Sequence, residues 1–224
     1  MKKFLMGSAV ACGAILAFAA VNTASAGNIA VANASFETLP GSGLPYGCGA
    51  GCSYSYSGDA PTNIPGWTGA GLYGQWQLGS YPALNYVPDG PTVAFTNGGS
   101  ISQTVGATAI AGLTYTLDVD VGFRKDVPDN SLIELVVGSN VVDATGVSNQ
   151  ASGNWYDWTA SYTALAGDAG DAISIVLACT GPQCDWDDVR LTSSASAVPE
   201  PGTFAVFGLA LLALGGLGLR RKFV

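Results

Sequence analysis

Thr114–Phe123 reads TYTLDVDVGF, and its apolar and polar residues alternate along the stretch. A β-strand points successive side chains to opposite faces, so a period of two is typical of a strand with one buried face. The expected core face carries Tyr115, Leu117, Val119, Val121 and Phe123, and the expected solvent face carries Thr114, Thr116, Asp118 and Asp120. The stretch therefore predicts a long strand in a β-rich domain.

The residues on both sides of this strand continue the β pattern. Short apolar runs separated by Gly, Pro, Asn and Asp recur, and no long amphipathic helix is indicated between Ala26 and Val198. We expect further strands at 29–36, 64–68, 72–78, 92–96, 101–105, 132–137, 141–144, 155–165, 172–179 and 186–192. Of these, 101–105 is expected to pair with 92–96 as a hairpin, and 138–140 to close another. About ten strands predict an all-β fold, an antiparallel β-sandwich of the jelly-roll type.

Charge and composition exclude several classes of function. The 224-residue chain has a formal charge of −8, and only Arg124, Lys125 and Arg190 of its eight basic residues lie within 27–197. We therefore expect no nucleic-acid partner, because nothing would neutralise the phosphates. The sequence has no histidine, which excludes Ser-His-Asp and Cys-His catalysis and histidine-ligated zinc.

The cysteines predict two disulfides in an exported chain. Without Cys12, which lies in the N-terminal segment, four remain: Cys48, Cys52, Cys179 and Cys184. Three pairings are possible, and the local pairs 48–52 and 179–184 are favoured. A zinc site made of the four cysteines is the alternative, which the unequal spacings and an oxidising compartment oppose. Residues 40–63 should form a long loop held by its own two cysteines.

The N-terminal segment 1–26 predicts a secretory signal peptide. It begins MKKF, continues as an apolar stretch and ends in Ala24, Ser25 and Ala26, which places cleavage after Ala26. A lipoprotein reading around Cys12 would leave an unusually short apolar stretch before the cysteine. Residues 27–197 then form one domain, long enough to bury a sizeable core.

The last stretch, 198–224, reads VPEPGTFAVFGLALLALGGLGLRRKFV. Pro199 and Pro201 fix their backbone angles and lack N–H donors, so this segment should be extended and accessible to an enzyme. The uncharged run 204–219 would span about 24 Å as a helix, which is short for a bilayer core. The cations at 220–222 should stay cytoplasmic, which places the body outside.

These residues resemble the PEP-CTERM sorting signal of exported bacterial proteins. The resemblance implies that Val198, Pro199, Glu200 and Pro201 are recognised by an exosortase, a membrane-embedded protease and transpeptidase that removes the tail. The protein would then be released or attached at the cell surface, in bacteria that have an outer membrane and make exopolysaccharide. The alternative is a single-span anchor that is never cut.

A second resemblance covers most of the body. It is to the galactose-binding-domain-like jelly roll of carbohydrate-binding modules, and its motifs are NASFE (33–37), IPGW (64–67), TYTLDVDVGFR (114–124) and WDDVRL (186–191). The resemblance implies neighbouring first and last strands and a structural Ca²⁺ held by Glu37 with Asp187 or Asp188. Strand phase separately predicts that Asp187 points inward, where calcium or backbone N–H groups would compensate its charge.

Aromatic residues are the candidates for ligand contact. Their rings can stack on the apolar faces of sugars, while a sandwich core also needs large residues. The candidates for stacking are Trp67, Tyr73, Trp76, Trp155 and Trp158. Asp118 and Asp120 lie on one strand face like a glycosidase pair, but outward acids on a strand are usually only solvated. No catalytic residue is predicted.

Together these features predict an exported, non-enzymatic cell-surface or matrix protein that binds extracellular polysaccharide and requires no cofactor. Its expected partners are the general secretion machinery, an exosortase and, before processing, the inner membrane through 204–219. A carbohydrate-active enzyme and a structural surface protein without a small ligand are the alternatives.

Overall fold

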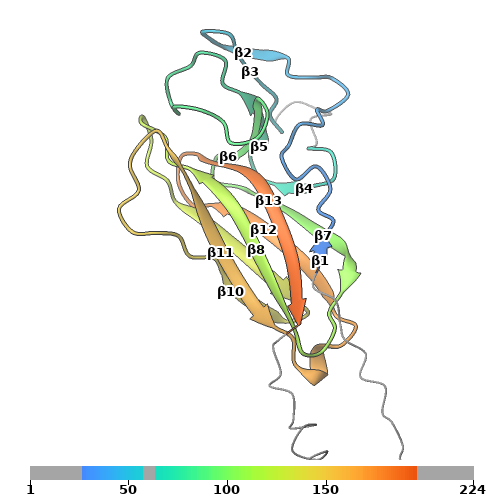
Figure 1. Cartoon of the computed structure of the whole chain (residues 1–224). Helices are drawn as coiled ribbons and strands as arrows, with labels where there is room; N and C mark the ends of the chain where they lie inside the picture. Colours follow the sequence, from blue (N-terminus) through green and yellow to red (C-terminus); the bar gives the residue numbers. More distant parts are fainter. Residues whose placement is uncertain (1–26, 58–63, 196–224) are drawn as a thin grey trace, which may run out of the picture.

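Two antiparallel sheets pack face to face in the computed structural model, which describes residues 27–57 and 64–195 (Figure 1). The predicted signal peptide, sorting motif and C-terminal helix lie outside the described residues. The all-β sandwich is confirmed: the one helix in the described part is a short 3-10 turn, η1 (Ala166–Asp168).

The larger sheet has eight strands. Its order is β11 (Trp155–Thr163), β8 (Leu113–Gly122), β13 (Cys184–Ala195), β6 (Thr92–Thr96), β5 (Tyr73–Gln77), β3 (Cys52–Tyr54) and β2 (Tyr46–Gly49). The eighth strand, β1 (Gly27–Ile29), pairs with β13. The first and last strands are therefore neighbours, as expected.

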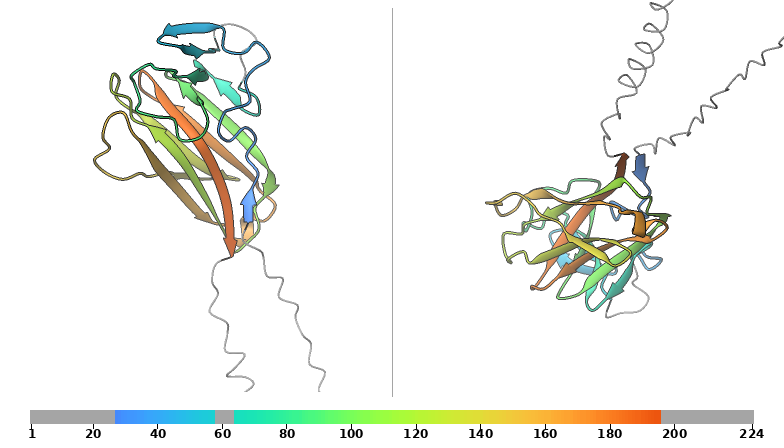
Figure 2. Two further views of the ribbon diagram at one scale, coloured as in Figure 1. Left: turned by 45° about the horizontal axis from the view of Figure 1, so that its top comes forward. Right: turned by 90° about the horizontal axis from the view of Figure 1, so that it is seen from below.

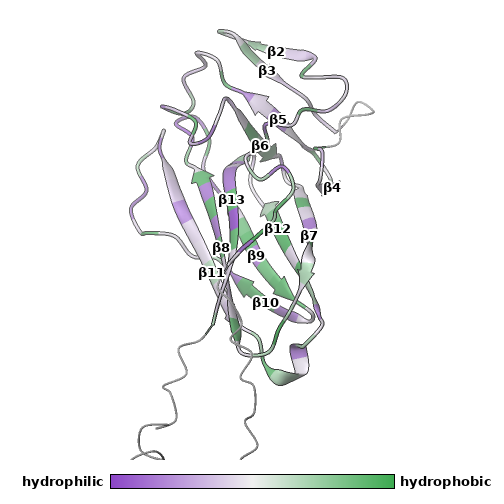
Figure 3. Cartoon of the chain, turned by 45° about the vertical axis from the view of Figure 1, so that its right-hand side comes forward, coloured by the Kyte–Doolittle hydropathy of each residue, from purple (hydrophilic) through white to green (hydrophobic). Residues whose placement is uncertain are grey.

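The smaller sheet has five strands. Its order is β10 (Asn140–Asp143), β9 (Ser131–Val137), β12 (Ala172–Cys179), β7 (Ser100–Thr108) and β4 (Thr68–Ala70). Hydrophobic residues recur along β9 and β12 (Figure 3). The predicted β9–β10 hairpin is confirmed, with Asn140 paired to Val137.

The main core lies between the sheets and follows the alternation seen in the sequence. Tyr115, Leu117, Val119 and Val121 of β8 are buried in it. The intervening residues of β8 are only half-buried. Burial of these large apolar side chains on one face explains why the strand keeps its register.

A second, smaller core lies on the opposite face of the larger sheet. In β6, Ala94 belongs to the main core, whereas Val93 and Phe95 on the other face pack with Trp76, Leu78, Ala83, Leu84 and Trp155. The loop 78–91 covers this part of the sheet. Strand alternation alone would have assigned that face to solvent.

Four predicted features differ from the structure. The strand expected at 64–68 begins only at Thr68, because the preceding residues form a turn in which Trp67 N–H donates to the Ile64 carbonyl at 3.0 Å. The strand expected at 29–36 ends at Ile29, because Asn33 and Phe36 adopt positive φ and Phe36 N–H bonds back to the Asn33 carbonyl. The strand near 101–105 does not pair with β6; it is part of β7, which crosses to the other sheet. The described part has thirteen strands, because the loop expected at 40–63 contains the hairpin β2–β3.

The molecule has two distinct ends. The hairpin β2–β3 forms one end, which we call the head, and β1 begins and β13 ends at the other, which we call the base (Figure 2). The head carries a cavity lined by aromatic residues.

Candidate functional site

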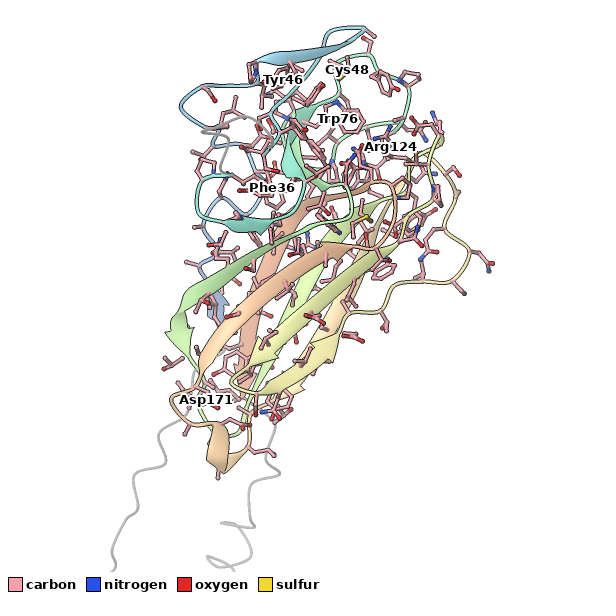
Figure 4. The ribbon with its side chains drawn as sticks, turned by 180° about the vertical axis from the view of Figure 1, so that it is seen from behind. Phe36, Tyr46, Cys48, Trp76, Arg124 and Asp171 are labelled. Atoms are coloured by element: carbon pink, nitrogen blue, oxygen red, sulfur yellow. A yellow bond between two sulfur atoms is a disulfide. The ribbon has the colours of Figure 1, made fainter. Side chains whose placement is uncertain are left out.

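A cavity of about 370 Å³ opens at the head. It lies between the hairpin β2–β3 and the ends of β5, β6, β8 and β13 (Figure 4). Its lining consists of Cys48, Tyr54, Tyr56, Trp76, Tyr81, Phe95, Asn97, Arg124 and Gln183. Five of these nine residues are aromatic, and this size and composition are typical of pockets for small organic ligands.

Strand register brings the aromatic rings together. Tyr54 of β3 pairs with Trp76 of β5, and β5 pairs in turn with β6, which carries Phe95. The Tyr54 and Phe95 rings meet edge-on with centroids 6.5 Å apart, and Tyr81 meets Trp76 in the same way at 5.8 Å. The walls therefore present ring faces and edges held by a sheet.

Arg124 supplies the positive charge of the cavity. Its guanidinium lies 4.8 Å from the centroid of the Trp76 ring and donates two hydrogen bonds to Asp126, at 2.8 and 2.6 Å. Its side chain is only 10% exposed. The hydrogen bond from Arg124 lowers the pKa of Asp126. Both contacts fix the guanidinium beside the rings.

A buried carboxyl lies behind the polar side of the cavity. Asp185 is fully buried, and Gln183 donates to its Oδ1 at 2.9 Å. Its Oδ2 has no hydrogen-bond partner within the described residues. Burial raises the pKa of this carboxyl to about 7, although the nearby Arg124 charge opposes the shift.

Both predicted disulfides are confirmed. Cys48–Cys52 joins the two strands of the head hairpin, and the Trp76 indole N–H donates to Cys52 Sγ at 2.7 Å. Cys179–Cys184 joins the end of β12 to the start of β13. The first bridge thus lies within the hairpin and contacts Trp76, which also lines the cavity.

The predicted stacking aromatics occupy different environments. Trp76 lines the cavity, whereas Trp67 and Tyr73 are buried in the main core and Trp155 in the second core. Trp158 is half-buried against Phe123. Core packing therefore accounts for three of the five.

Sequence reasoning missed most of the cavity. Tyr54 and Tyr56 lie in the expected long loop, and Tyr81, Phe95 and Arg124 are not among the predicted site residues. The alternation SYSY at 53–56 and the scarcity of cations in the body were the available signals. Neither signal shows which strands become neighbours.

The predicted calcium residues hold the loop 88–92. Glu37 accepts from the Thr92 N–H at 2.7 Å, and Asp187 accepts from the N–H groups of Asp89 and Asp188 at 3.0 and 2.8 Å. Asp187 is buried, and burial raises its pKa to about 8. The predicted strand phase is wrong, however: Asp187 pairs with Asp120 on the outer face of the sheet, because a bulge at Asp188, which has positive φ, separates it from the core residues Val189 and Leu191. No group of three acidic or cysteine side chains suited to a metal occurs in the part described. Backbone donors satisfy both carboxylates, so calcium stays a prediction.

A network of charges lies on the outer face of the larger sheet. Arg190 forms close ion pairs with Asp157 and Asp188, and it lies 3.8 Å from Asp120. Burial, followed by contact with Asp157, raises the pKa of Asp120 to about 7. Asp118 accepts from the Thr159 hydroxyl. These contacts account for Asp118 and Asp120 on β8 without a catalytic role for either.

The motif at 198–201 lies outside the described residues. Among the residues that are described, no helix is long and apolar enough to cross a membrane.

Comparisons with known proteins match both parts of the chain. Residues 27–192 match the family model described as HpiC1 cyclase, and residues 197–222 match that of the PEP-CTERM protein-sorting motif. The predicted sorting motif is thereby confirmed. No curated protein matches the chain.

Solved structures share the fold of the body. The Stig cyclase FisC from Fischerella sp. TAU, in complex with (3Z)-3-(1-methyl-2-pyrrolidinylidene)-3H-indole, is 23% identical, with a TM-score of 0.61 over 77% of this chain and 100% of its own. An apo cyclase from Fischerella sp. is 24% identical, with a TM-score of 0.62 over 77% and 99%. A xylan-binding domain from Paenibacillus barcinonensis is 12% identical, with a lower TM-score of 0.40 over 61% of this chain and 90% of its own.

Proposed function

Because the chain belongs to the HpiC1-like cyclase family and carries a PEP-CTERM sorting motif, we propose that it is an exported surface protein that binds a ring-shaped ligand without converting it. The ligand is the terminal ring of an extracellular glycan. The head cavity is the binding site, and an exosortase processes the tail after the general secretion machinery has exported the chain. Before processing, the run 204–219 anchors the precursor in the inner membrane.

The aromatic cavity at the head carries the proposal. Its rings offer flat apolar faces, and Asn97, Gln183 and Arg124 add polar groups to its lining. A sugar ring presents apolar C–H faces and hydroxyls at its edge, so it matches both kinds of surface. FisC is described with an indole derivative bound, so an indole is the rival ligand.

The chemistry of the lining favours binding over catalysis. None of the nine lining residues carries a carboxyl, and Cys48 is in a disulfide. The nearest buried acid, Asp185, has no exposed surface through which to reach a ligand. General acid catalysis requires the acid within hydrogen-bond reach of the reacting atom.

Titration of the cavity tests the proposal. The protein is titrated with oligosaccharides from extracellular polysaccharides and, separately, with indole, while intrinsic Trp fluorescence and heat are recorded. We expect saturable binding that Tyr81→Ala weakens. Tyr86→Ala is the matched control, because Tyr86 is 53% exposed and lies outside the cavity. Equal binding by both variants would contradict the proposal.

An acid-catalysed cyclase is the second candidate function. The family match favours it, and Asp185, whose pKa burial raises to about 7, is the candidate acid if a rearrangement of the second core exposes it to the cavity. Mass spectrometry of the ligand after incubation decides between the two. A product that forms with the wild type and is lost in Asp185→Asn would establish an enzyme, and reducing-sugar release would indicate glycan cleavage.

A further inference from the structure

The base of the molecule carries an exposed apolar surface made by two loops. Ile110 and Leu165 are 54% and 66% exposed, and Leu165 is the most exposed large hydrophobic residue of the described chain. Ile110 follows β7, and Leu165 follows β11. Isolated exposed apolar residues need no explanation, but a pair at one end of a molecule can mark a contact surface.

Hydrogen bonds hold these two loops together. Gly112 N–H donates to the Ala164 carbonyl, Ala109 N–H to the Asp171 carbonyl, and Gly170 N–H to the Ala109 carbonyl, each at 2.8 Å. Asp168 also accepts from the Leu165 N–H at 2.7 Å. The two side chains are therefore displayed on fixed backbone.

The same end of the sandwich carries the end of β13. Ala195 pairs with Leu113, and Thr114 in turn pairs with Thr163. The loop before β8, which carries Ile110, and the loop after β11, which carries Leu165, therefore lie beside the point where β13 ends. Asp171 marks this end in Figure 4. The sorting segment therefore begins at the base.

The length of the tether restricts which end can meet the membrane. Eight residues, 196–203, separate β13 from the apolar run, and they can reach at most about 29 Å. β13 has twelve residues and is about 40 Å long, with Cys184 toward the head and Ala195 at the base. In an anchored precursor the head, with its cavity, cannot approach the bilayer end-on.

We propose that the base is a docking surface for a neutral lipid membrane, into which Ile110 and Leu165 insert while the precursor is anchored. This inference rests on the anchored precursor of the proposed function. The basal loops contain Asp168 and Asp171 and no Lys or Arg, so zwitterionic headgroups suit the base and anionic ones oppose it. The cavity then faces away from the bilayer, toward extracellular ligands.

Site-specific lipid quenching tests the orientation. The exported full chain with its sorting segment intact is prepared in a host without exosortase and reconstituted into phosphatidylcholine vesicles. Ile110→Cys or Leu165→Cys is labelled with an environment-sensitive fluorophore, with both native disulfides closed. Tyr86→Cys and Val147→Cys are matched controls, since their native side chains are 53% and 57% exposed.

We expect blue-shifted emission and strong quenching by spin-labelled lipid at positions 110 and 165, and neither at positions 86 and 147. Vesicles of phosphatidylglycerol should reduce the quenching. Chain that floats with the vesicles but shows equal signals at all four positions would overturn only this inference. Chain that fails to float would overturn the anchored precursor and this inference with it, while ligand titration of the cavity tests the binding site independently.

Discussion

At the scale of single residues, Asp185 is the least expected feature of the fold. A fully buried carboxyl with one partnerless oxygen should be costly when ionised, and burial raises its pKa to about 7. The main chain around it alternates normally: Trp186 points into the main core, and Asp185 points to the other face. Its burial results from the second core, which closes over that face.

This raised pKa predicts how stability depends on pH. The folded state keeps its proton up to higher pH than the unfolded state, so stability is greatest below the unfolded pKa and falls as pH rises toward 7. We expect Asp185 to remove up to about 4 kcal/mol of unfolding free energy between about pH 4 and pH 8. Denaturant titrations of Asp185→Asn across this range should show a smaller decline.

The exposed substitution Asp143→Asn serves as the control for that experiment. It should leave the pH dependence unchanged, because Asp143 lies exposed on β10. If the wild type and Asp185→Asn declined equally with pH, the assignment of the decline to Asp185 would be wrong.

Residue phase was the part of the site that sequence reasoning could predict. The buried face of β8 follows from alternation alone, whereas the direction of Asp187 does not, because the bulge at Asp188 shifts the phase of β13. The roles of Trp67, Tyr73 and Trp155 do not, because a large ring suits a core and a binding surface equally well. Only the sheet order shows that Trp76 borders a cavity and the other three do not.

At the scale of elements, the hairpin β2–β3 forms the wall of the cavity. It lies at the edge of the larger sheet, where it pairs only with β5, and the bridge Cys48–Cys52 closes it. A short hairpin is marginal without such support. The bridge therefore matters for ligand binding as well as for stability.

Removing the Cys48–Cys52 bridge should weaken ligand binding more, and reduce stability less, than removing Cys179–Cys184. We expect Cys48→Ser with Cys52→Ser to destabilise the protein by about 2 kcal/mol, as for a short closed loop, and to weaken ligand binding because Tyr54 and Tyr56 lose their fixed position. The comparison is Cys179→Ser with Cys184→Ser, whose bridge is buried in the main core and should cost more stability. Calorimetric titration and thermal melting measure both effects, and equal losses of affinity would contradict the role of the hairpin.

The loop 88–92 depends on Glu37 in a similar way. Glu37 accepts from both the N–H and the hydroxyl of Thr92, and Gly90 has positive φ with no space for a side chain beside Glu37. We expect Glu37→Ala to cost about 1–3 kcal/mol, because it leaves these donors without their charged acceptor. Glu37→Gln, which keeps an acceptor oxygen, should cost less in the same denaturant titration.

Thermal melting of the wild type with calcium and with a chelator tests the predicted calcium site. Because N–H groups already occupy the Glu37 and Asp187 carboxylates, an unchanged Tm would show that hydrogen bonds alone satisfy them and would contradict the calcium prediction. A calcium-dependent rise in Tm that Asp187→Asn abolishes would instead establish the calcium site.

The position of a strand was predictable because it depends on local sequence. The pairing of one strand with another was not, because it depends on residues far apart in the chain. Most strands formed near their expected positions because their apolar runs and turn residues are local signals. The segment 31–36 has an apolar strand composition but turns, since the Asn33 side chain binds Thr38 and stabilises the bend. The turn at 97–99 suits a hairpin or a crossing between sheets, and local sequence does not distinguish them.

At the scale of the whole molecule, the fold places the cavity and the end of β13 at opposite ends of the domain. The cavity lies at the head, and the chain continues toward the sorting motif from the base (Figure 2). The pairing of β1 with β13 places the first and last described residues of the domain side by side. An exosortase could therefore act at the base without disturbing the head.

Processing at the motif gives the last prediction. Proline fixes φ and lacks an N–H donor, so we expect Pro199→Ala with Pro201→Ala to prevent recognition and leave the tail attached. Pro128→Ala, in an exposed loop of the domain, is the control and should be processed normally. Intact mass of protein from its native cells measures the outcome: the wild type and the control should lack both ends and gain four hydrogens on reduction, two for each bridge. The same C-terminus on all three proteins would show that the Pro-Glu-Pro segment does not direct cleavage, and a tail on the wild type would make the protein a permanent membrane protein.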